Sequence, residues 1–202
     1  MARSRLRLLV DRAAFPLLVF LTTEQARRLH LTPLDDERVE ACLPYCSGLL
    51  LDTGCGPNEL VRRHGQGAGV VVYRWPGIDI LCDTRRLPFR DASFDTAALL
   101  AVLNHVPPHD RETVLKEVHR VLRPAGRLLI TMLDPVTGRI VHRLRLRQDP
   151  DQQERGMREE EDYGLWDSEV RGLLQETGFR MERRRRFVFG LNNLYVATKA
   201  SL

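Results

Sequence analysis

The chain has 202 residues, of which 43% are hydrophobic, 29% are charged and 6% are aromatic. This length fits one domain, and the apolar content suffices for a core, which excludes a chain that is disordered throughout. The formal net charge is +4, and so small an excess does not by itself predict a nucleic-acid partner.

The first 45 residues differ from the rest of the chain and are expected to form a helical cap. Arginines and leucines interleave over residues 3–12, and an apolar run that contains Pro16 follows over residues 13–21. That run is too short to span a bilayer. Two roles are open for this segment: a lid over the rest of the chain, or a helix that lies on a membrane surface with its arginines at anionic head groups. A second helix is expected over residues 33–43.

The four cysteines, Cys42, Cys46, Cys55 and Cys82, do not have the spacing of a zinc site. Cys42 and Cys46 are four residues apart, and no second Cys or His pair accompanies them. We therefore expect reduced thiols. No secretory signal is visible in the sequence, and a cytoplasmic location is expected.

From Gly48 onward, strand and helix patterns alternate, which is typical of a parallel sheet covered by helices on both faces. Strands are predicted at 48–51, 70–73, 78–82, 96–102 and 127–132, with helices from about Asn58 and over 110–122. A basic, loop-like insertion is expected over 135–166, followed by a helix over 168–177. Only Gly190–Asn193 separate the last two strands, 180–189 and 194–199, which predicts an antiparallel hairpin. Residues 46–202 are thus predicted to form one α/β domain.

Two glycines lie where the first strand meets the first helix, in Leu51-Asp52-Thr53-Gly54-Cys55-Gly56-Pro57-Asn58. Glycine lets a backbone approach a ligand closely and adopt positive φ. The helix N-terminus that follows offers unpaired N–H groups to a carboxylate or phosphate. The dinucleotide fingerprint needs a third glycine, where this chain has Glu59, so a nicotinamide-dependent enzyme is disfavoured.

Three ordered segments resemble class I S-adenosylmethionine-dependent methyltransferases of the broad type 11 group. The first is the glycine turn at 51–58, and the second runs from Asp83 through Leu87-Pro88-Phe89 to Asp91-Ala92-Ser93-Phe94-Asp95. The third is Leu122-Arg123-Pro124-Ala125-Gly126-Arg127-Leu128, ahead of the fifth strand. The resemblance covers roughly residues 48–134. It implies a Rossmann-like methyltransferase fold, with a mostly parallel sheet, a C-terminal antiparallel hairpin and helices on both faces.

The resemblance also implies S-adenosylmethionine as the cofactor and a role for each matched residue. Asp52 would orient the glycine turn and contact the amino group of the cofactor. Asp83 and the Thr84 N–H would meet the adenine, and backbone near Ala101 would meet the methionyl ammonium. The backbone of Gly54, Cys55 and Gly56 would pass beside the methionyl and ribose parts of the cofactor. The helix that follows would begin near Asn58.

The chain departs from the family at the end of the second strand, where an acid usually holds both ribose hydroxyls. Here the sequence reads Val70-Val71-Val72-Tyr73-Arg74-Trp75-Pro76, without an acid. Tyr73 is expected to offer a hydroxyl contact, and Trp75 to lie on the adenine face. The missing carboxylate keeps open a methyltransferase-like binding module that has the fold without the activity.

His105 is the candidate catalytic base. Methyl transfer from a sulfonium needs alignment of the reacting atoms and exclusion of water, and a base helps when the acceptor is a hydroxyl or an acidic carbon. His105 follows the fourth strand, and imidazole titrates near neutrality. The alternative role for His105 is structural, or a contact with the cofactor carboxylate.

The acceptor is expected to be a small organic or lipid-like molecule, methylated at oxygen or carbon. The Asn-Pro-Pro-aromatic signature of amino methylation is absent, and Asn104-His105-Val106-Pro107-Pro108 does not substitute for it. The insertion at 135–166 is expected to cover the acceptor. Candidate contacts with the acceptor are His142, Tyr163, Trp166, Asn192 and Asn193.

An RNA or protein substrate stays open as an alternative. Arg183–Arg186 form a run of four arginines inside a predicted strand. Such a run is either a charged sheet edge that discourages pairing with other chains or a patch for RNA or an acidic substrate. The leading interpretation expects a small-molecule partner and no nucleic acid, and it leaves the oligomeric state open.

Overall fold

The described part of the chain folds around one seven-stranded sheet. The computed structural model describes residues 10, 13–14, 21, 23–72, 78–145 and 161–200. The strand order is β3-β2-β1-β4-β5-β7-β6. The strands are β1 (Leu50–Thr53), β2 (Gly67–Val71), β3 (Ile80–Leu81), β4 (Phe94–Leu100), β5 (Leu122–Leu133), β6 (Phe179–Phe187) and β7 (Asn192–Lys199).

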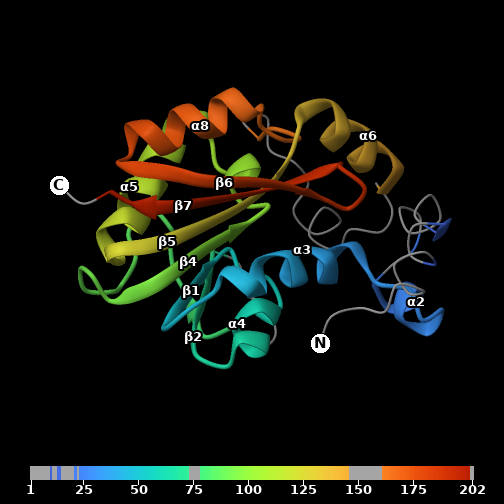
Figure 1. Ribbon diagram of the computed structural model, residues 1–202, viewed down its shortest axis with the longest axis horizontal. Helices are drawn as coiled ribbons and strands as arrows, with labels where there is room; N and C mark the ends of the chain where they lie inside the picture. Colours follow the sequence, from blue (N-terminus) through green and yellow to red (C-terminus); the bar gives the residue numbers. More distant parts are fainter. Residues whose placement is uncertain are drawn as a thin grey trace.

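The predicted fold class is confirmed. Strands β1 to β5 pair in parallel, and β7 runs antiparallel to both β5 and β6. Helices lie on both sides of the sheet (Figure 1). The helices are α2 (Thr23–Arg28), α3 (Leu34–Cys42), α4 (Glu59–His64), α5 (Arg111–Val121), α6 (Pro135–Arg145) and α8 (Asp167–Glu176), with short 3-10 helices η1 (Leu43–Tyr45), η2 (Leu103–His105) and η3 (Pro108–Asp110).

The core has two layers because successive strand residues point to opposite faces of a sheet. On one face, Leu51 and Leu99 pack with the apolar residues of α5 and α8. On the other face, Leu50, Ala98 and Leu129 pack with α3 and α4. The central strands are therefore apolar on both sides, which is typical of a parallel sheet covered by helices. This arrangement leaves the carboxyl ends of the strands as the edge where side chains from several strands converge.

Residues 72–79 join β2 to its parallel neighbour β3. Parallel neighbours are usually joined by a crossover of a dozen or more residues, commonly a helix. The connection in this chain is therefore shortened. Tyr73 and Trp75, the two expected contacts for ribose and adenine, lie in 73–77, outside the described residues.

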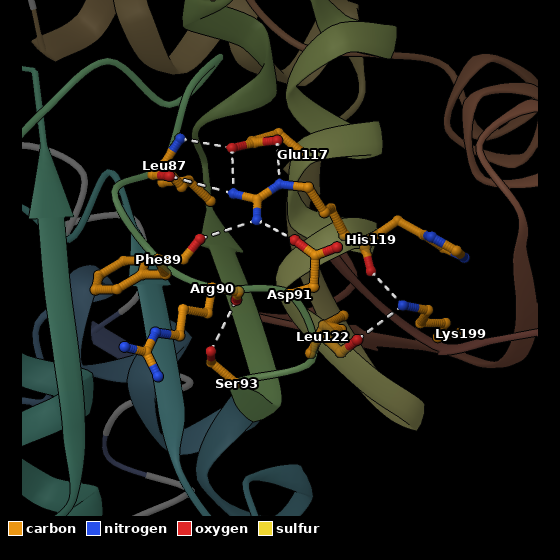
Figure 2. A network of polar contacts seen from close by, with 10 residues as sticks. Leu87, Phe89, Arg90, Asp91, Ser93, Glu117, His119, Leu122 and Lys199 are labelled. Carbon is orange, nitrogen blue, oxygen red and sulfur yellow. Dashed lines mark hydrogen bonds and ion pairs between the residues drawn. The ribbon is translucent and has the colours of Figure 1, made fainter.

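A network of ion pairs holds the second matched segment against α5 (Figure 2). The Glu117 carboxylate accepts from the Leu87 N–H at 2.8 Å and from Arg120 at 2.7 Å. Arg120 also donates to Asp91 and to the Phe89 carbonyl. Nearby, Lys199 Nζ donates to the carbonyls of His119 and Leu122, at 2.7 and 2.8 Å. The contacts of Glu117 and Arg120 thus anchor the segment that leads into β4.

The expectation of a loop directly after Asp134 is wrong, because α6 occupies Pro135–Arg145. Asp134 accepts hydrogen bonds from the N–H groups of Val136 and Thr137 and from the Thr137 hydroxyl, and so acts as a helix cap. Pro135 suits the first helical position, where its missing N–H costs nothing. The Asp-Pro pair was the sequence signal for this helix.

The cap region is described only in part. Its α2 and α3 precede β1, and the helix expected over 33–43 is present as α3. The apolar run at 13–21 falls mostly outside the described residues, so neither of its two roles is tested. Among the residues that the structure describes, no helix is long and apolar enough to cross a membrane.

Two helical glycines give a matched test of this packing. An added Cβ at Gly138 in α6 would lie 1.8 Å from the Tyr163 carbonyl oxygen, whereas one at Gly172 in α8 would meet no atom within 4 Å in the part of the chain that the structure describes. Gly138→Ala should therefore lower the free energy of unfolding by about 1–3 kcal/mol through overpacking. Gly172→Ala should raise it by about 0.5–1 kcal/mol, because alanine loses less backbone entropy in a helix. Urea denaturation measures both, and equal shifts would contradict the packing of α6.

Candidate active site

The candidate site lies at the carboxyl edge of β1, β4 and β5. Parallel α/β sheets bind ligands at this edge, where the connecting loops meet. The glycine turn follows β1, and η2 with His105 follows β4. Asp52 lies opposite Gly69 of β2 and Ala98 of β4, which places the turn at the centre of the sheet.

The glycine turn uses left-handed backbone at both glycines. Gly54 has φ +72° and Gly56 has φ +50°. A Cβ at Gly54 would lie 2.5 Å from Val102 Cγ2, so that glycine is required by packing within the protein. A Cβ at Gly56 would meet no heavy atom of the described residues within 4 Å. The turn is therefore open at Gly56, where a ligand can approach the backbone.

Two N–H groups of the turn already have hydrogen-bond acceptors within the protein. Those of Gly54 and Cys55 donate to the Val70 carbonyl of β2, at 2.8 and 3.1 Å. These amides hold the turn against β2 rather than facing a ligand. The thiol of Cys55 is buried, which raises its pKa to about 12. Cys55 is thus a neutral packing residue under the turn.

Asp52 is a buried carboxylate at the end of β1. Only 2% of the residue is exposed, and its Oδ1 has no hydrogen-bond partner among the described residues. Burial raises the pKa of Asp52 to about 8. An isolated buried charge is costly, so such a group is either neutral or matched to a donor. A ligand that carries a cation or hydrogen-bond donors would supply that match.

Asn58 links the end of the turn to β2 through Asp79. Its backbone is left-handed, with φ +59°, and its side-chain Nδ2 donates to Asp79 Oδ2 at 2.8 Å. The Gly69 N–H donates to the same oxygen at 2.7 Å. Asp79 was missed in the sequence, although it is an acid between two isoleucines in the short β2–β3 connection. It ties the start of α4 to β2 instead of lying at the end of β2.

Asp83 follows β3, and its carboxylate is ion-paired with Arg85. Arg85 donates to Asp83 Oδ2 through Nη2 at 2.7 Å and through Nε at 3.0 Å. These hydrogen bonds from Arg85 lower the pKa of Asp83, so the carboxylate is ionised. Its side chain is 47% exposed, whereas the neighbouring Thr84 is buried. Asp83 can accept from a further donor only by sharing its oxygens with Arg85.

Ala101 turns the chain away from the sheet after β4. Its φ is +57°, and its N–H donates to the Thr131 carbonyl at 3.1 Å. Left-handed backbone costs a residue with a Cβ roughly 1–2 kcal/mol. Such positions cluster at functional sites. The turn leads directly into η2, which carries His105.

His105 is paired with a carboxylate that sequence reasoning did not find. Its Nδ1 lies 3.0 Å from Glu161 Oε2. Arg111, also missed, is buried and donates through Nε to the carbonyls of Leu103 and Val106, each at 3.0 Å. Its Nη2 binds the carboxylate of Asp162. Glu161 and Asp162 end an acidic run at 159–162, and no sequence signal distinguishes which acid meets His105.

The five residues that were expected to contact the acceptor lie in different environments. His142 and Tyr163 are brought together, with ring centroids 4.8 Å apart, and Trp166 is exposed. Asn193 is structural, because it donates to the Met132 carbonyl at 3.3 Å and accepts from Arg184 at 2.8 Å. The buried Oδ1 of Asn192 and Oγ1 of Thr131 lack partners among the described residues. Strand alternation puts Thr131 and Asn192 on the α3 side of the sheet.

Comparison with known proteins supports the family. Residues 49–130 match the family model of the type 11 methyltransferase domain. A probable tRNA methyltransferase 9B of Mus musculus is 33% identical over 93 residues, covering 41% of this chain and 21% of that protein. The 27-O-demethylrifamycin SV methyltransferase of Amycolatopsis mediterranei is 34% identical over 119 residues, covering 46% of this chain and 42% of that protein.

The fold matches over a longer stretch than the sequence. The crystal structure of 1,6-didemethyltoxoflavin-N1-methyltransferase from Burkholderia thailandensis, with 1,6-didemethyltoxoflavin and S-adenosylhomocysteine bound, gives a TM-score of 0.64 at 16% identity. That likeness covers 100% of this chain and 92% of the other, and shows the fold alone. The chain spans about a fifth of the mouse relative and about two fifths of the Amycolatopsis relative. The ordered motifs, the family-model match over residues 49–130 and the sheet support a class I S-adenosylmethionine-dependent methyltransferase domain of the type 11 group.

Proposed function

We propose that this protein transfers the methyl group of S-adenosylmethionine to oxygen or carbon of a small organic acceptor, at the carboxyl edge of β1, β4 and β5. The observation that carries the proposal is the Asp52 carboxylate. It is buried, has an oxygen without a partner among the described residues, and lies in the strand that leads to the open backbone of Gly56. Asp52 and Gly56 would hold the methionyl and ribose parts, and Asp83 with Thr84 would receive the adenine.

The cofactor supplies an electrophilic methyl group on a sulfonium sulfur, and the protein has to align the acceptor and keep water out. The turn at Ala101 leads into η2, which carries His105, and Val102 between them packs against Gly54 of the glycine turn. His105 would take the proton from an acceptor hydroxyl or acidic carbon as that atom forms its bond to the methyl group. The buried oxygens of Thr131 and Asn192 would bind polar groups of the acceptor.

A small acceptor is favoured by the Amycolatopsis relative, whose name states a rifamycin substrate, which is a small organic molecule. The buried Oδ1 of Asn192 and Oγ1 of Thr131, which lack partners among the described residues, also favour a small polar ligand, because such ligands bind in buried pockets with a few polar groups.

RNA is the second candidate acceptor, because several curated relatives are named as probable tRNA methyltransferases. Strand β6 forms one edge of the sheet, and its exposed arginines are Arg180, Arg183, Arg185 and Arg186. Arginines neutralise phosphates in RNA complexes. The same arginines also serve as a charged edge that blocks pairing with another sheet. A binding module without activity is the third candidate, since β2 is not followed by an acid at residues 72–76.

The acceptor class is decided by a direct assay. In one arm the protein is incubated with S-adenosylmethionine and phenols, macrolactone alcohols or quinols, and in the other with S-adenosylmethionine and transcribed tRNA. The product S-adenosylhomocysteine is quantified by mass spectrometry in both arms. We expect turnover with a hydroxylated small molecule and none with tRNA. His105→Ala should lower kcat about 100-fold or more, as loss of a general base does, with little change in cofactor affinity. Turnover of tRNA alone would replace the proposal, and cofactor binding without any turnover would support the binding module.

Two left-handed glycines test the position of the cofactor. Gly56 and Gly65 have φ +50° and +93°, and a Cβ at either would meet no atom of the described residues within 4 Å. A residue with a Cβ adopts φ +50° more readily than φ +93°. Backbone strain alone would therefore disturb Gly65→Ala at least as much as Gly56→Ala, but only Gly56 borders the proposed site. Gly56→Ala should weaken S-adenosylhomocysteine at least 10-fold in calorimetric titration, and Gly65→Ala should bind like wild type. Equal affinities for the three proteins would place the cofactor elsewhere.

Asp52 should make cofactor binding depend on pH. Burial raises its pKa to about 8, so the free protein carries a neutral Asp52 at about pH 7. Donor groups of the cofactor favour the charged carboxylate and lower this pKa. Binding at about pH 7 should therefore release a proton, and affinity should rise between about pH 6 and pH 8.

Titration calorimetry in two buffers of different ionisation enthalpy measures this proton, and Asp52→Asn should remove it. In the free protein, the raised pKa of Asp52 means that its contribution to stability is complete below the unfolded pKa of 3.8 and is lost as pH rises toward 8. Asp52→Asn should therefore stabilise the free protein more at about pH 8 than at about pH 5. Affinity that is independent of pH in wild type would contradict the role of Asp52.

A further inference from the structure

We propose that Glu161 is a positioning residue for His105: its carboxylate accepts the Nδ1–H of the imidazole and leaves Nε2 as the basic nitrogen. This inference rests on the proposed function, in which His105 takes a proton from the acceptor. Glu161 would orient the base His105, although it lies far from His105 in the sequence and outside the three matched motifs.

The two side chains are close, and their burial is unequal. Nδ1 of His105 and Oε2 of Glu161 are 3.0 Å apart, and the side chains are 30% and 2% exposed. A carboxylate withdrawn so completely from water needs a donor, because an unpaired buried charge is costly. The partially exposed imidazole keeps access to the space outside the pair. The pair therefore differs from a surface ion pair, which is mobile and contributes little.

A single guanidinium holds both sides of the pair. Arg111 donates to the carbonyls of Leu103 and Val106, which flank His105, and its Nη2 binds Asp162, which follows Glu161. The Asp162 N–H also donates to the Asn104 carbonyl at 2.9 Å. The backbones on both sides of the His105–Glu161 hydrogen bond are thus tied together independently of that bond.

The other end of the segment 161–165 is fixed to the sheet. The Leu165 N–H donates to the Leu133 carbonyl at the end of β5, at 3.1 Å. Between these anchors, the Tyr163 ring contacts His142, and the Arg139 guanidinium lies 5.5 Å from its centroid. Segment 161–165 therefore connects η2, β5 and α6. A side chain presented by so constrained a backbone is preorganised, which is what a residue that orients a base requires.

The chemistry follows from the two ring nitrogens. In a neutral imidazole, the hydrogen bond made by one nitrogen decides which nitrogen carries the proton. With Nδ1–H donated to Glu161, the lone pair is on Nε2. As the acceptor oxygen bonds to the methyl group and the methyl–sulfur bond breaks, the acceptor proton passes to Nε2. The products are the methyl ether, S-adenosylhomocysteine and an imidazolium beside the Glu161 carboxylate, which then loses its proton to water.

The test reads the imidazole itself and needs no acceptor. Ring ¹⁵N spectra are recorded on the full chain with labelled histidine, at about pH 9, above the ordinary range for imidazole. His105→Asn identifies the His105 signals. We expect wild type to show a single tautomer protonated at Nδ1. Glu161→Gln should lose this preference, and Glu112→Gln, which removes an exposed carboxylate on α5 that pairs with Lys116, should retain it.

A wild-type His105 that is protonated at Nε2, or that populates both tautomers, overturns the proposal even if Glu161→Gln does not fold. A second readout is turnover. Glu161→Gln should lower kcat at least 10-fold and leave S-adenosylhomocysteine affinity unchanged, whereas a purely structural residue would change both. A locked Nδ1–H tautomer in a protein without turnover would overturn the proposed function while leaving the pair intact, so the two failures are distinguishable.

Discussion

The buried Arg111 guanidinium is the interaction on which the candidate site depends. It satisfies the carbonyls of Leu103 and Val106 where the chain leaves β4, and it binds Asp162 from a segment about 50 residues away. The Leu103 carbonyl also accepts the Val106 N–H at 3.3 Å, and a side chain with several N–H groups can serve both carbonyls of this irregular backbone at once. Charge-assisted bonds of this kind are stronger than neutral ones. Together with the backbone hydrogen bonds of η2, this side chain fixes the position of His105.

Whereas Arg111 stabilises the candidate site, Asp52 lowers the stability of the free protein. Its carboxylate is buried in the sheet without enough donors, which raises its pKa to about 8 and costs stability in the free protein at neutral pH. A more stable protein would have an apolar residue there. Retaining the acid is reasonable only where a ligand supplies donors, and the open backbone at Gly56 lies four residues away. In the proposed function, local instability and ligand affinity come from the same group.

The shortened connection between β2 and β3 is compensated by Asp79. In the resembled family, this connection contributes a ribose-binding acid, and here residues 72–76 contain none. Asp79 instead bonds to Asn58 and to the Gly69 N–H, so it joins the start of α4 to β2. The glycine turn is held from β2 as well, through Val70. The glycine turn and the start of α4 are therefore both hydrogen-bonded to β2.

The sequence by itself determined the class of fold and pointed to the place of the candidate site. Apolar runs, the glycines at 54 and 56 and the hairpin spacing after Phe189 are local signals, because strand burial and positive φ act on neighbouring residues. Tertiary structure alone decided the partners. The pairing of Asp83 with Arg85, of Asn58 with Asp79 and of His105 with Glu161 depends on where side chains meet. The last pair joins residues 56 positions apart, and no periodicity reports which of several acids will reach an imidazole across a fold.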